Sequence, residues 1–175
     1  IHGDLHTGSI FINEESTKVF DPEFCFYGPM GYDIGNVIAN MIFAWANGDA
    51  AGAADFCKWV EDVLVDVINM TKEKMEKYYD EHVTDTMCRN ELYKKYYMDT
   101  IIEDTSAVAG LELIRRIVGM ANVKDITTIA DEAKRARAEK ICITAAIDFI
   151  KNRSDKKCGK CFLKTLKDAI AEVDA

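Results

Sequence analysis

The chain has 175 residues, 49% of them hydrophobic and 30% charged, which is the composition of one ordinary globular domain. Its net charge of −8 argues against a nucleic-acid partner, because phosphate binding requires a basic face. No apolar run is long enough to cross a bilayer and no secretion signal is visible, so we expect a cytoplasmic protein without a membrane partner.

The first thirty residues predict a small β-hairpin. Residues 9–13 form a short apolar run, residues 18–20 a second one, and the polar run 14–17 between them is typical of a turn. The breaker cluster Gly28-Pro29-Met30-Gly31 then separates this element from the rest of the chain. We therefore expect one unit over residues 1–31 and a helical body over residues 32–175.

Apolar side chains recur at spacings of three and four residues from Tyr32 onward, which is the period of an α-helix. The only prolines are Pro22 and Pro29, so the body lacks the strongest helix breaker. The pattern predicts helices at about 32–47, 51–82, 88–103, 105–121, 129–152 and 160–173. The expected fold class is mainly α with a small β-hairpin.

Six cysteines are scattered along the chain, and Cys158-Gly-Lys-Cys161 is the one CxxC motif. A structural zinc site would need a second cysteine pair or nearby histidines, and His82 is the only histidine beyond the first six residues. We interpret the motif as reduced thiols of a cytoplasmic protein, with zinc as the alternative.

Two acidic clusters carry the chemistry: His2-Gly3-Asp4-Leu5-His6, and Asp21-Pro22-Glu23 on the far side of the hairpin. A kinase needs one carboxylate that orients and deprotonates the acceptor hydroxyl, and further ligands that hold magnesium against the phosphates of ATP. We predict that Asp4 is the catalytic base and that Asp21 and Glu23 bind Mg²⁺.

The spacing also matches the protein-kinase pattern H-R-D-L-x-x-x-N, since Ser9 stands five positions after Asp4, where the pattern has its metal-binding Asn. Serine is a poorer metal ligand than asparagine. The D-F-G motif, however, is replaced by Asp21-Pro22-Glu23, which supplies two carboxylates of the kind magnesium prefers. We therefore predict that Ser9 is a weak metal contact and that Glu23 compensates for it.

These residues resemble the catalytic loop of aminoglycoside-phosphotransferase-like kinases, the small-molecule relatives of protein kinases. The longer run H-G-D-L-H-T-G-S, with D-P-E-F and Y-G-P-M-G-Y-D-I-G, is similar to the methylthioribose kinase family. The likeness is dense over residues 2–35 and resumes at residues 111–119, which are similar to that family's paired-arginine helix. The resemblance implies the C-terminal lobe of a protein-kinase-like fold.

The resemblance also implies an activity: ATP-dependent phosphorylation of the anomeric (1-) hydroxyl of 5-methylthioribose, in methionine salvage, with Mg²⁺ as cofactor. It implies that Asp4 contacts the substrate and that Asp21, Pro22 and Glu23 form the nucleotide and magnesium motif. It further implies that Arg115, Arg116 or both face the sugar and the transferred phosphoryl group.

Two architectural expectations accompany these roles. Adjacent helical residues point about 100° apart, so we expect one arginine to face the substrate while the other braces a carboxylate. Asp33 is expected to tie the start of a helix to the catalytic loop and to cap that helix.

The chain contains no G-x-G-x-x-G phosphate loop, which a complete kinase of this kind would carry in an N-terminal lobe. We therefore expect these residues to be the C-terminal lobe alone and to be inactive by themselves. Without the N-terminal lobe, apolar surface that it would cover is exposed, and such surface favours association. A homodimer is therefore an open expectation.

Three alternatives stay open. Another acceptor, such as choline, an aminoglycoside or a different sugar, would fit the same loop. His2, Asp4 and His6 alternate, so on a strand they would share one face and could bind the metal of a hydrolase. A non-catalytic helical module is the third. Under this alternative the acidic loop is incidental, and the kinase interpretation fails if Asp4, Asp21 and Glu23 do not converge within bridging distance of one metal.

Overall fold

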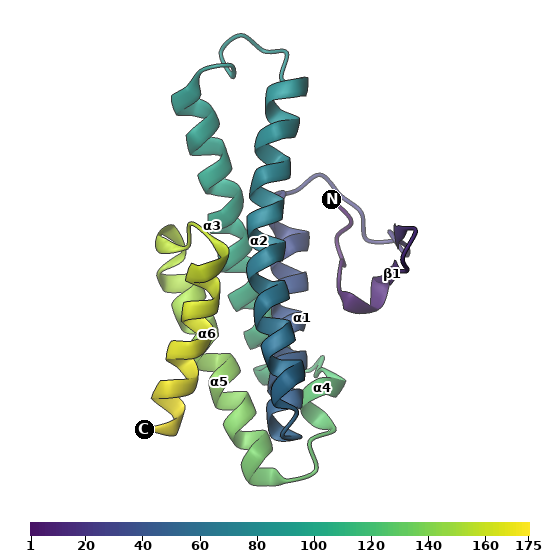
Figure 1. Ribbon diagram of the computed structural model, residues 1–175, viewed down its shortest axis with the longest axis vertical. Coiled ribbons are helices and arrows are strands. Elements are labelled where there is room, and N and C mark those ends of the chain that lie inside the picture. The colour runs from purple at the N-terminus through teal and green to yellow at the C-terminus, as the bar shows by residue number, and fades with distance from the viewer.

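The computed structural model describes residues 1–175 and shows a bundle of helices with a small β-hairpin at one side (Figure 1). The mainly α fold class with one hairpin is confirmed. The helices are α1 (Gly31–Ala50), α2 (Ala54–His82), α3 (Glu91–Val118), α4 (Lys124–Thr127), α5 (Glu132–Lys151) and α6 (Gly159–Asp174). Short 3₁₀ turns cover Thr7–Ser9 and Arg153–Asp155.

Helices α1 and α3 form the centre of the bundle and approach each other closely. A β-carbon placed on Gly35 of α1 would lie 2.7 Å from the carbonyl oxygen of Thr105 on α3, which is closer than atoms can pack. The absence of a side chain at Gly35 therefore sets how near the two helix backbones come. This contact fixes the first turns of α1, on which the N-terminal loop rests.

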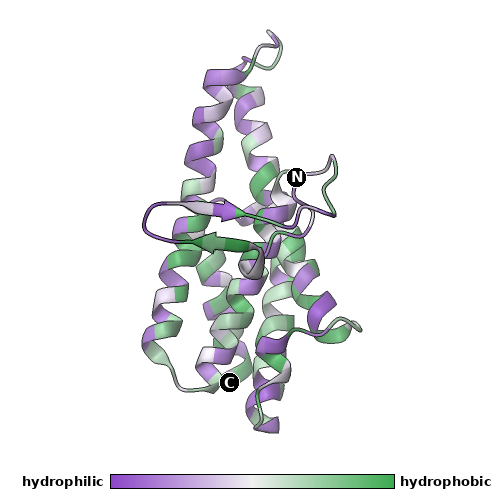
Figure 2. Cartoon of the chain, turned by 90° about the vertical axis from the view of Figure 1, so that its right-hand side faces the viewer, coloured by the Kyte–Doolittle hydropathy of each residue, from purple (hydrophilic) through white to green (hydrophobic).

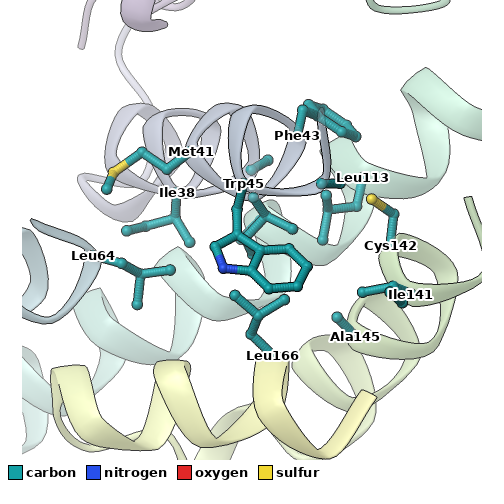
Figure 3. Packing of buried hydrophobic residues seen from close by; sticks show 14 of the residues in the cluster. Ile38, Met41, Phe43, Trp45, Leu64, Leu113, Ile141, Cys142, Ala145 and Leu166 are labelled. Atoms are coloured by element: carbon teal, nitrogen blue, oxygen red, sulfur yellow. The ribbon is translucent and has the colours of Figure 1, made fainter. Parts of the chain in front are cut away.

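The hydrophobic core lies among α1, α2, α3, α5 and α6 (Figure 3). Trp45 sits in its middle and its indole N–H donates to Glu61 Oε1 at 3.0 Å, so the one polar atom of this buried ring is satisfied. Glu61 is itself 6% exposed and pairs with Lys167 of α6. The fully buried side chains with the largest volumes include Phe43, Phe149, Phe162, Ile38, Ile42, Leu64, Ile68, Leu113, Ile141 and Leu166.

One predicted helix boundary is wrong: the break expected between residues 103 and 105 is absent, and α3 is continuous over 28 residues. Thr105 and Ser106 at the expected break are fully buried, yet their hydroxyls have partners. Thr105 donates to the Ile101 carbonyl at 2.8 Å, and Ser106 donates to the Phe149 carbonyl of α5 at 2.8 Å. Buried hydroxyls that are hydrogen-bonded in this way do not interrupt a helix.

The upper part of α2 and α3 extends beyond the core as a two-helix arm (Figure 1). Ile68 is the last buried residue of α2, and Met98 is the first of α3. The hydropathy colouring shows the same division, with polar residues dominating the arm and apolar residues the bundle (Figure 2). No helix of the chain combines the length and the apolar character that a bilayer span requires.

The predicted hairpin is present, with β1 (Ile10–Ile12) antiparallel to β2 (Thr17–Val19) and Ile10 opposite Val19. Its turn is an Asx turn, because Asn13 Oδ1 accepts from the backbone N–H groups of Glu15 at 3.0 Å and Ser16 at 2.7 Å. Figure 2 shows the hairpin lying across the helical body. It therefore separates the two acidic clusters in sequence and returns the second toward the first.

Candidate active site

The loop His2–His6 is held in place by Asp33 in the first turn of α1. Its carboxylate accepts the backbone N–H of His2 at 2.6 Å through Oδ2 and that of Gly3 at 2.9 Å through Oδ1. Asp33 is only 8% exposed, so these charge-assisted bonds are shielded from water. The prediction that Asp33 ties the helix to the loop is confirmed. The prediction that Asp33 caps α1 is wrong, because α1 has no side-chain cap and both carboxylate oxygens of Asp33 accept from the loop.

His2 joins the loop to the end of the hairpin. Its Nδ1 accepts the backbone N–H of Asp4 at 3.3 Å, so its Nε2 carries the proton and donates to the Phe20 carbonyl at 2.9 Å. Both ring nitrogens are thus used by the backbone. The hydrolase alternative, in which His2, Asp4 and His6 share a strand face, is not formed: residues 1–6 contain no strand and no metal-holding group of three such side chains exists.

Gly3 brings the two acidic clusters into contact. Its φ is +86°, and a β-carbon there would lie 2.2 Å from the carbonyl oxygen of Phe24. Only glycine satisfies both the left-handed backbone and this close approach. The segment that follows Asp21-Pro22-Glu23 therefore packs directly against the backbone next to Asp4.

Asp4 projects from this braced loop with a carboxylate that is 42% exposed. The His6 ring stands beside it, with Nε2 at 4.0 Å from Asp4 Oδ2. Because His6 Nδ1 accepts the Gly8 N–H at 3.0 Å, the neutral ring carries its proton on Nε2, toward Asp4. A rigid backbone thus presents an accessible carboxylate, which is what a base acting on a bound hydroxyl requires.

Ser9 has a structural position in this loop. It is 3% exposed, and its hydroxyl accepts the His6 N–H at 3.0 Å while lying 3.0 Å from the His6 carbonyl and 3.3 Å from that of Asp4. The single hydroxyl proton is directed to these carbonyls, and burial keeps the remaining lone pair from solvent. This geometry suits loop bracing, and the weak metal contact expected of Ser9 stays a prediction.

Asp21 and Glu23 are both exposed on the loop after β2, and Cys25 N–H closes a turn there onto the Pro22 carbonyl at 3.0 Å. Asp21 is the one non-glycine residue with a left-handed backbone, φ +67°, which aspartate tolerates better than most residues. The two carboxylates supply hard oxygen donors suited to magnesium.

The convergence expected of Asp4, Asp21 and Glu23 is not observed, because no group of three acidic, histidine or cysteine side chains could hold one metal ion. The geometric test set for the kinase interpretation is therefore not met, and taken alone this geometry favours the helical module. In kinase chemistry the catalytic base and the metal ligands have separate tasks. A catalytic base has to reach the acceptor hydroxyl and does not have to bind the metal. Magnesium commonly takes one or two carboxylates, with phosphates and waters completing its shell.

Arg115 and Arg116 near the end of α3 share one buried partner, Glu112. Arg115 holds its carboxylate with two parallel bonds, Nε to Oε2 at 2.6 Å and Nη2 to Oε1 at 2.9 Å. Arg116 Nε adds a third, to Oε1 at 2.7 Å. Glu112 is 6% exposed, so both guanidinium groups neutralise a carboxylate that burial would otherwise make unfavourable.

The two arginines differ in what they face. The Arg115 side chain is 53% exposed, whereas that of Arg116 is 26% exposed and also donates to the Ala121 carbonyl at 3.3 Å. The hydrogen bond to Glu112 is the main reason that the pKa of Arg115 lies above its ordinary value, and the nearby charge of Asp4 raises it further. Arg115 is thus the more exposed of the two arginines, and Asp4 is among the charges that raise its pKa.

Glu112 is the residue of this site that the sequence interpretation missed. A signal for it exists in the sequence, since Glu112 precedes Arg115 and Arg116 by three and four positions, the spacings at which helical side chains meet. Its burial, which makes the three groups a fixed unit, was not visible from that spacing.

We expect Asp33→Asn to loosen the catalytic loop without unfolding the helices. An amide offers one acceptor where two backbone N–H groups need one each, so a bond to a charged acceptor worth about 1.5–3 kcal/mol is lost. Limited proteolysis should therefore cut residues 1–30 faster, while circular dichroism stays helical.

Asp55→Asn is the matched control, because Asp55 is also an acidic residue in the first turn of a helix but is exposed on α2. It should change proteolysis of the loop little. Equal cleavage rates in the two variants would show that Asp33 acts only on the helix end and does not hold the loop.

Comparison with known proteins shows what the chain is similar to. Residues 1–64 match the model of a family described as "Phosphotransferase enzyme family". Methylthioribose kinase 1 of Oryza sativa subsp. japonica is 37% identical over 172 residues, which cover 87% of this chain and 39% of that protein. Methylthioribose kinases of Bacillus pumilus and Escherichia coli are 36% and 33% identical, over 86% and 87% of this chain.

The chain thus spans about two fifths of the length of these curated relatives, with 39%, 37% and 40% of each covered. The aligned part includes most of the helical body as well as the loops. The resemblance predicted from the two acidic clusters is therefore confirmed: the chain is similar to methylthioribose kinases over most of its length, at 33–37% identity.

Proposed function

We propose that the protein to which these residues belong is an ATP-dependent kinase that phosphorylates the anomeric hydroxyl of 5-methylthioribose, a reaction of methionine salvage. The observation that carries the proposal is the similarity to proteins named methylthioribose kinase. It is also supported by the accessible carboxylate of Asp4 and the half-exposed guanidinium of Arg115, whose pKa the charge of Asp4 helps to raise.

In this proposal Asp4 accepts a hydrogen bond from the sugar hydroxyl and takes its proton as the phosphoryl group is transferred. The Asp33 bonds hold the loop so that the carboxylate does not need to reorganise. The Nε2–H group of His6 lies 4.0 Å from Asp4 Oδ2. From there it can stabilise the negative charge of the Asp4 carboxylate before the proton transfer.

Arg115 is assigned to the transferred phosphoryl group, and Arg116 to bracing. The exposed guanidinium of Arg115 uses Nε and Nη2 for Glu112, which leaves Nη1 for phosphoryl or sugar oxygens. Arg116 is tied to Glu112 and to the Ala121 carbonyl, which suits a residue that fixes the end of α3.

Asp21 and Glu23 would hold Mg²⁺, with Pro22 shaping the turn between them for the nucleotide. Magnesium, when bound, neutralises charge on the phosphates. The left-handed backbone at Asp21 supports a functional position, because such conformations cluster at active sites.

We also propose that residues 1–31 and 32–175 together act as the C-terminal lobe of a kinase-like fold in the cytoplasm. The coverage of the relatives supports this, and so does the lack of a G-x-G-x-x-G motif in these residues. We accordingly expect the 175 residues alone to show no turnover. Assembly as a homodimer stays a prediction.

The test is a substrate panel with a protein that carries these residues and a nucleotide-binding lobe. ATP consumption with 5-methylthioribose should exceed that with choline, with aminoglycosides and with ribose by at least about a hundredfold in kcat/KM. Product NMR should place the phosphate on the anomeric oxygen. Preferential turnover of choline or an aminoglycoside would keep the kinase assignment and overturn the acceptor, whereas no turnover with any acceptor would overturn both.

A further inference from the structure

The CxxC motif, which the proposed kinase chemistry does not use, forms a close pair of thiols at the start of α6. The sulfur atoms of Cys158 and Cys161 lie 3.2 Å apart, and both residues are partly exposed. The thiols of the other four cysteines, Cys25, Cys57, Cys88 and Cys142, do not contact another thiol. The pair is therefore the only place in the chain where two thiols are already in contact.

The surrounding chain holds this pair firmly. The backbone N–H of Gly159, between the two cysteines, donates to Asn69 Oδ1 of α2 at 2.9 Å. Lys156 donates to Asp148 of α5 at 2.6 Å, and Lys157 donates to Glu103 of α3 at 2.9 Å. Anchors on three helices hold the chain on either side of Cys158, and the two sulfur atoms are already in contact, so closing a disulfide needs little rearrangement of the backbone.

The local charge favours the thiolate form of Cys161. Burial raises its pKa, but hydrogen bonds from the Cys158 thiol and from the backbone of residues 157 and 158, with the charge of Lys156, bring the pKa below the ordinary thiol value. By contrast, burial raises the pKa of Cys142 to about 12 and also raises that of Cys57. Since the thiolate is the reactive form, Cys161 differs chemically from the core cysteines.

We propose that Cys158 and Cys161 are a redox-active dithiol that exchanges reversibly with low-molecular-weight disulfides. This site is independent of the proposed kinase chemistry and would persist if that proposal failed. The contact of the two sulfur atoms carries it, since a reactive thiol and a resolving thiol are already adjacent.

The exchange proceeds in two steps. The Cys161 thiolate attacks one sulfur of a disulfide RSSR. The S–S bond of RSSR breaks, RS⁻ leaves, and a mixed disulfide remains on Cys161. Cys158 then loses its proton to the released RS⁻ and attacks the Cys161 sulfur, expelling the second RS⁻, which takes a proton from water buffered by the solution. Overall, two cysteine thiols are oxidised to one disulfide while RSSR is reduced to two RSH, and no other oxidant is needed.

The test uses the reduced 175-residue chain with glutathione disulfide as the probe, followed by acid quenching, alkylation and peptide mass mapping. We expect an internal Cys158–Cys161 disulfide to form at least about threefold faster than any adduct on exposed Cys25, and dithiothreitol to restore both thiols. Faster modification of Cys25 with the pair still reduced would overturn the proposal, and so would failure of dithiothreitol to reverse the bond.

Two variants separate the roles of the thiols. Cys158 is the N-cap residue of α6 and makes no capping hydrogen bond, so Cys158→Ser places a favoured N-cap residue there and should keep the fold. It should accumulate glutathione on Cys161, because the resolving thiol is gone. Cys25→Ser is the matched control and should oxidise the pair at the unchanged rate. A stable mixed disulfide on Cys161 in the unaltered chain would show a lone reactive thiol and overturn the dithiol.

Discussion

Asp4→Asn is expected to lower kcat by about two to four orders of magnitude in the enzyme that carries these residues, while ATP affinity changes little. Asparagine keeps the shape of the side chain but cannot take the proton of the acceptor hydroxyl, and general-base catalysis is worth that much. The nucleotide contacts are assigned to Asp21 and Glu23, so binding of ATP should survive. Steady-state kinetics and nucleotide titration measure the two quantities separately.

Glu172→Gln is the control for this experiment, because Glu172 is an exposed acid on α6. It changes the net charge by the same amount and should leave kcat within about twofold, as surface substitutions away from a site usually do. An Asp4→Asn enzyme with normal kcat would remove Asp4 from the role of base. Loss of ATP binding together with kcat would instead place Asp4 in the nucleotide site.

Glu112→Gln is expected to lower both stability and activity. The buried carboxylate accepts three hydrogen bonds from two guanidinium groups, and a neutral amide leaves two cations side by side with one weak acceptor. Loss of a buried charge partner should reduce the free energy of unfolding by about 2–3 kcal/mol. Because Arg115 is half exposed, water screens its share, so most of the loss comes from Arg116 and the buried acid.

Urea unfolding and kinetics check this second result. Arg115 should also lose its fixed direction, so kcat/KM should fall about tenfold or more. Glu132→Gln, at an exposed acid in the first turn of α5, is the matched control and should leave both quantities nearly unchanged. Unfolding midpoints that agree between the two variants would mean that the Glu112 bonds add nothing to stability.

Local patterns predicted most of the architecture. The hairpin, the turn after its first strand and the helical body follow from alternation, turn residues and the three-and-four spacing of apolar side chains, which are properties of short stretches of chain. The tie between Asp33 and the loop was also predicted, from the resemblance. These features need no knowledge of which surfaces meet.

What the sequence did not reveal depends on burial and on contacts between distant segments. The polar run at Thr105 and Ser106 suggested a break, but its hydroxyls are satisfied inside the bundle. Ser9 matched a metal-ligand position by spacing, which did not indicate that its hydroxyl is also hydrogen-bonded within the loop. Glu112 precedes two arginines at helical spacing in the sequence, but only its 6% exposure in the structure distinguishes it from an ordinary surface acid.

The attachment of the catalytic loop at Asp33 has a consequence for how the protein opens. The loop and hairpin have mostly exposed side chains and contribute no residue to the hydrophobic core. The two backbone amides held by the Asp33 carboxylate are therefore their main polar link to α1. Such a segment can detach as a unit at a fraction of the global unfolding free energy. The same two amide protons should then exchange with solvent by this partial opening, long before those in the middle of α1 do.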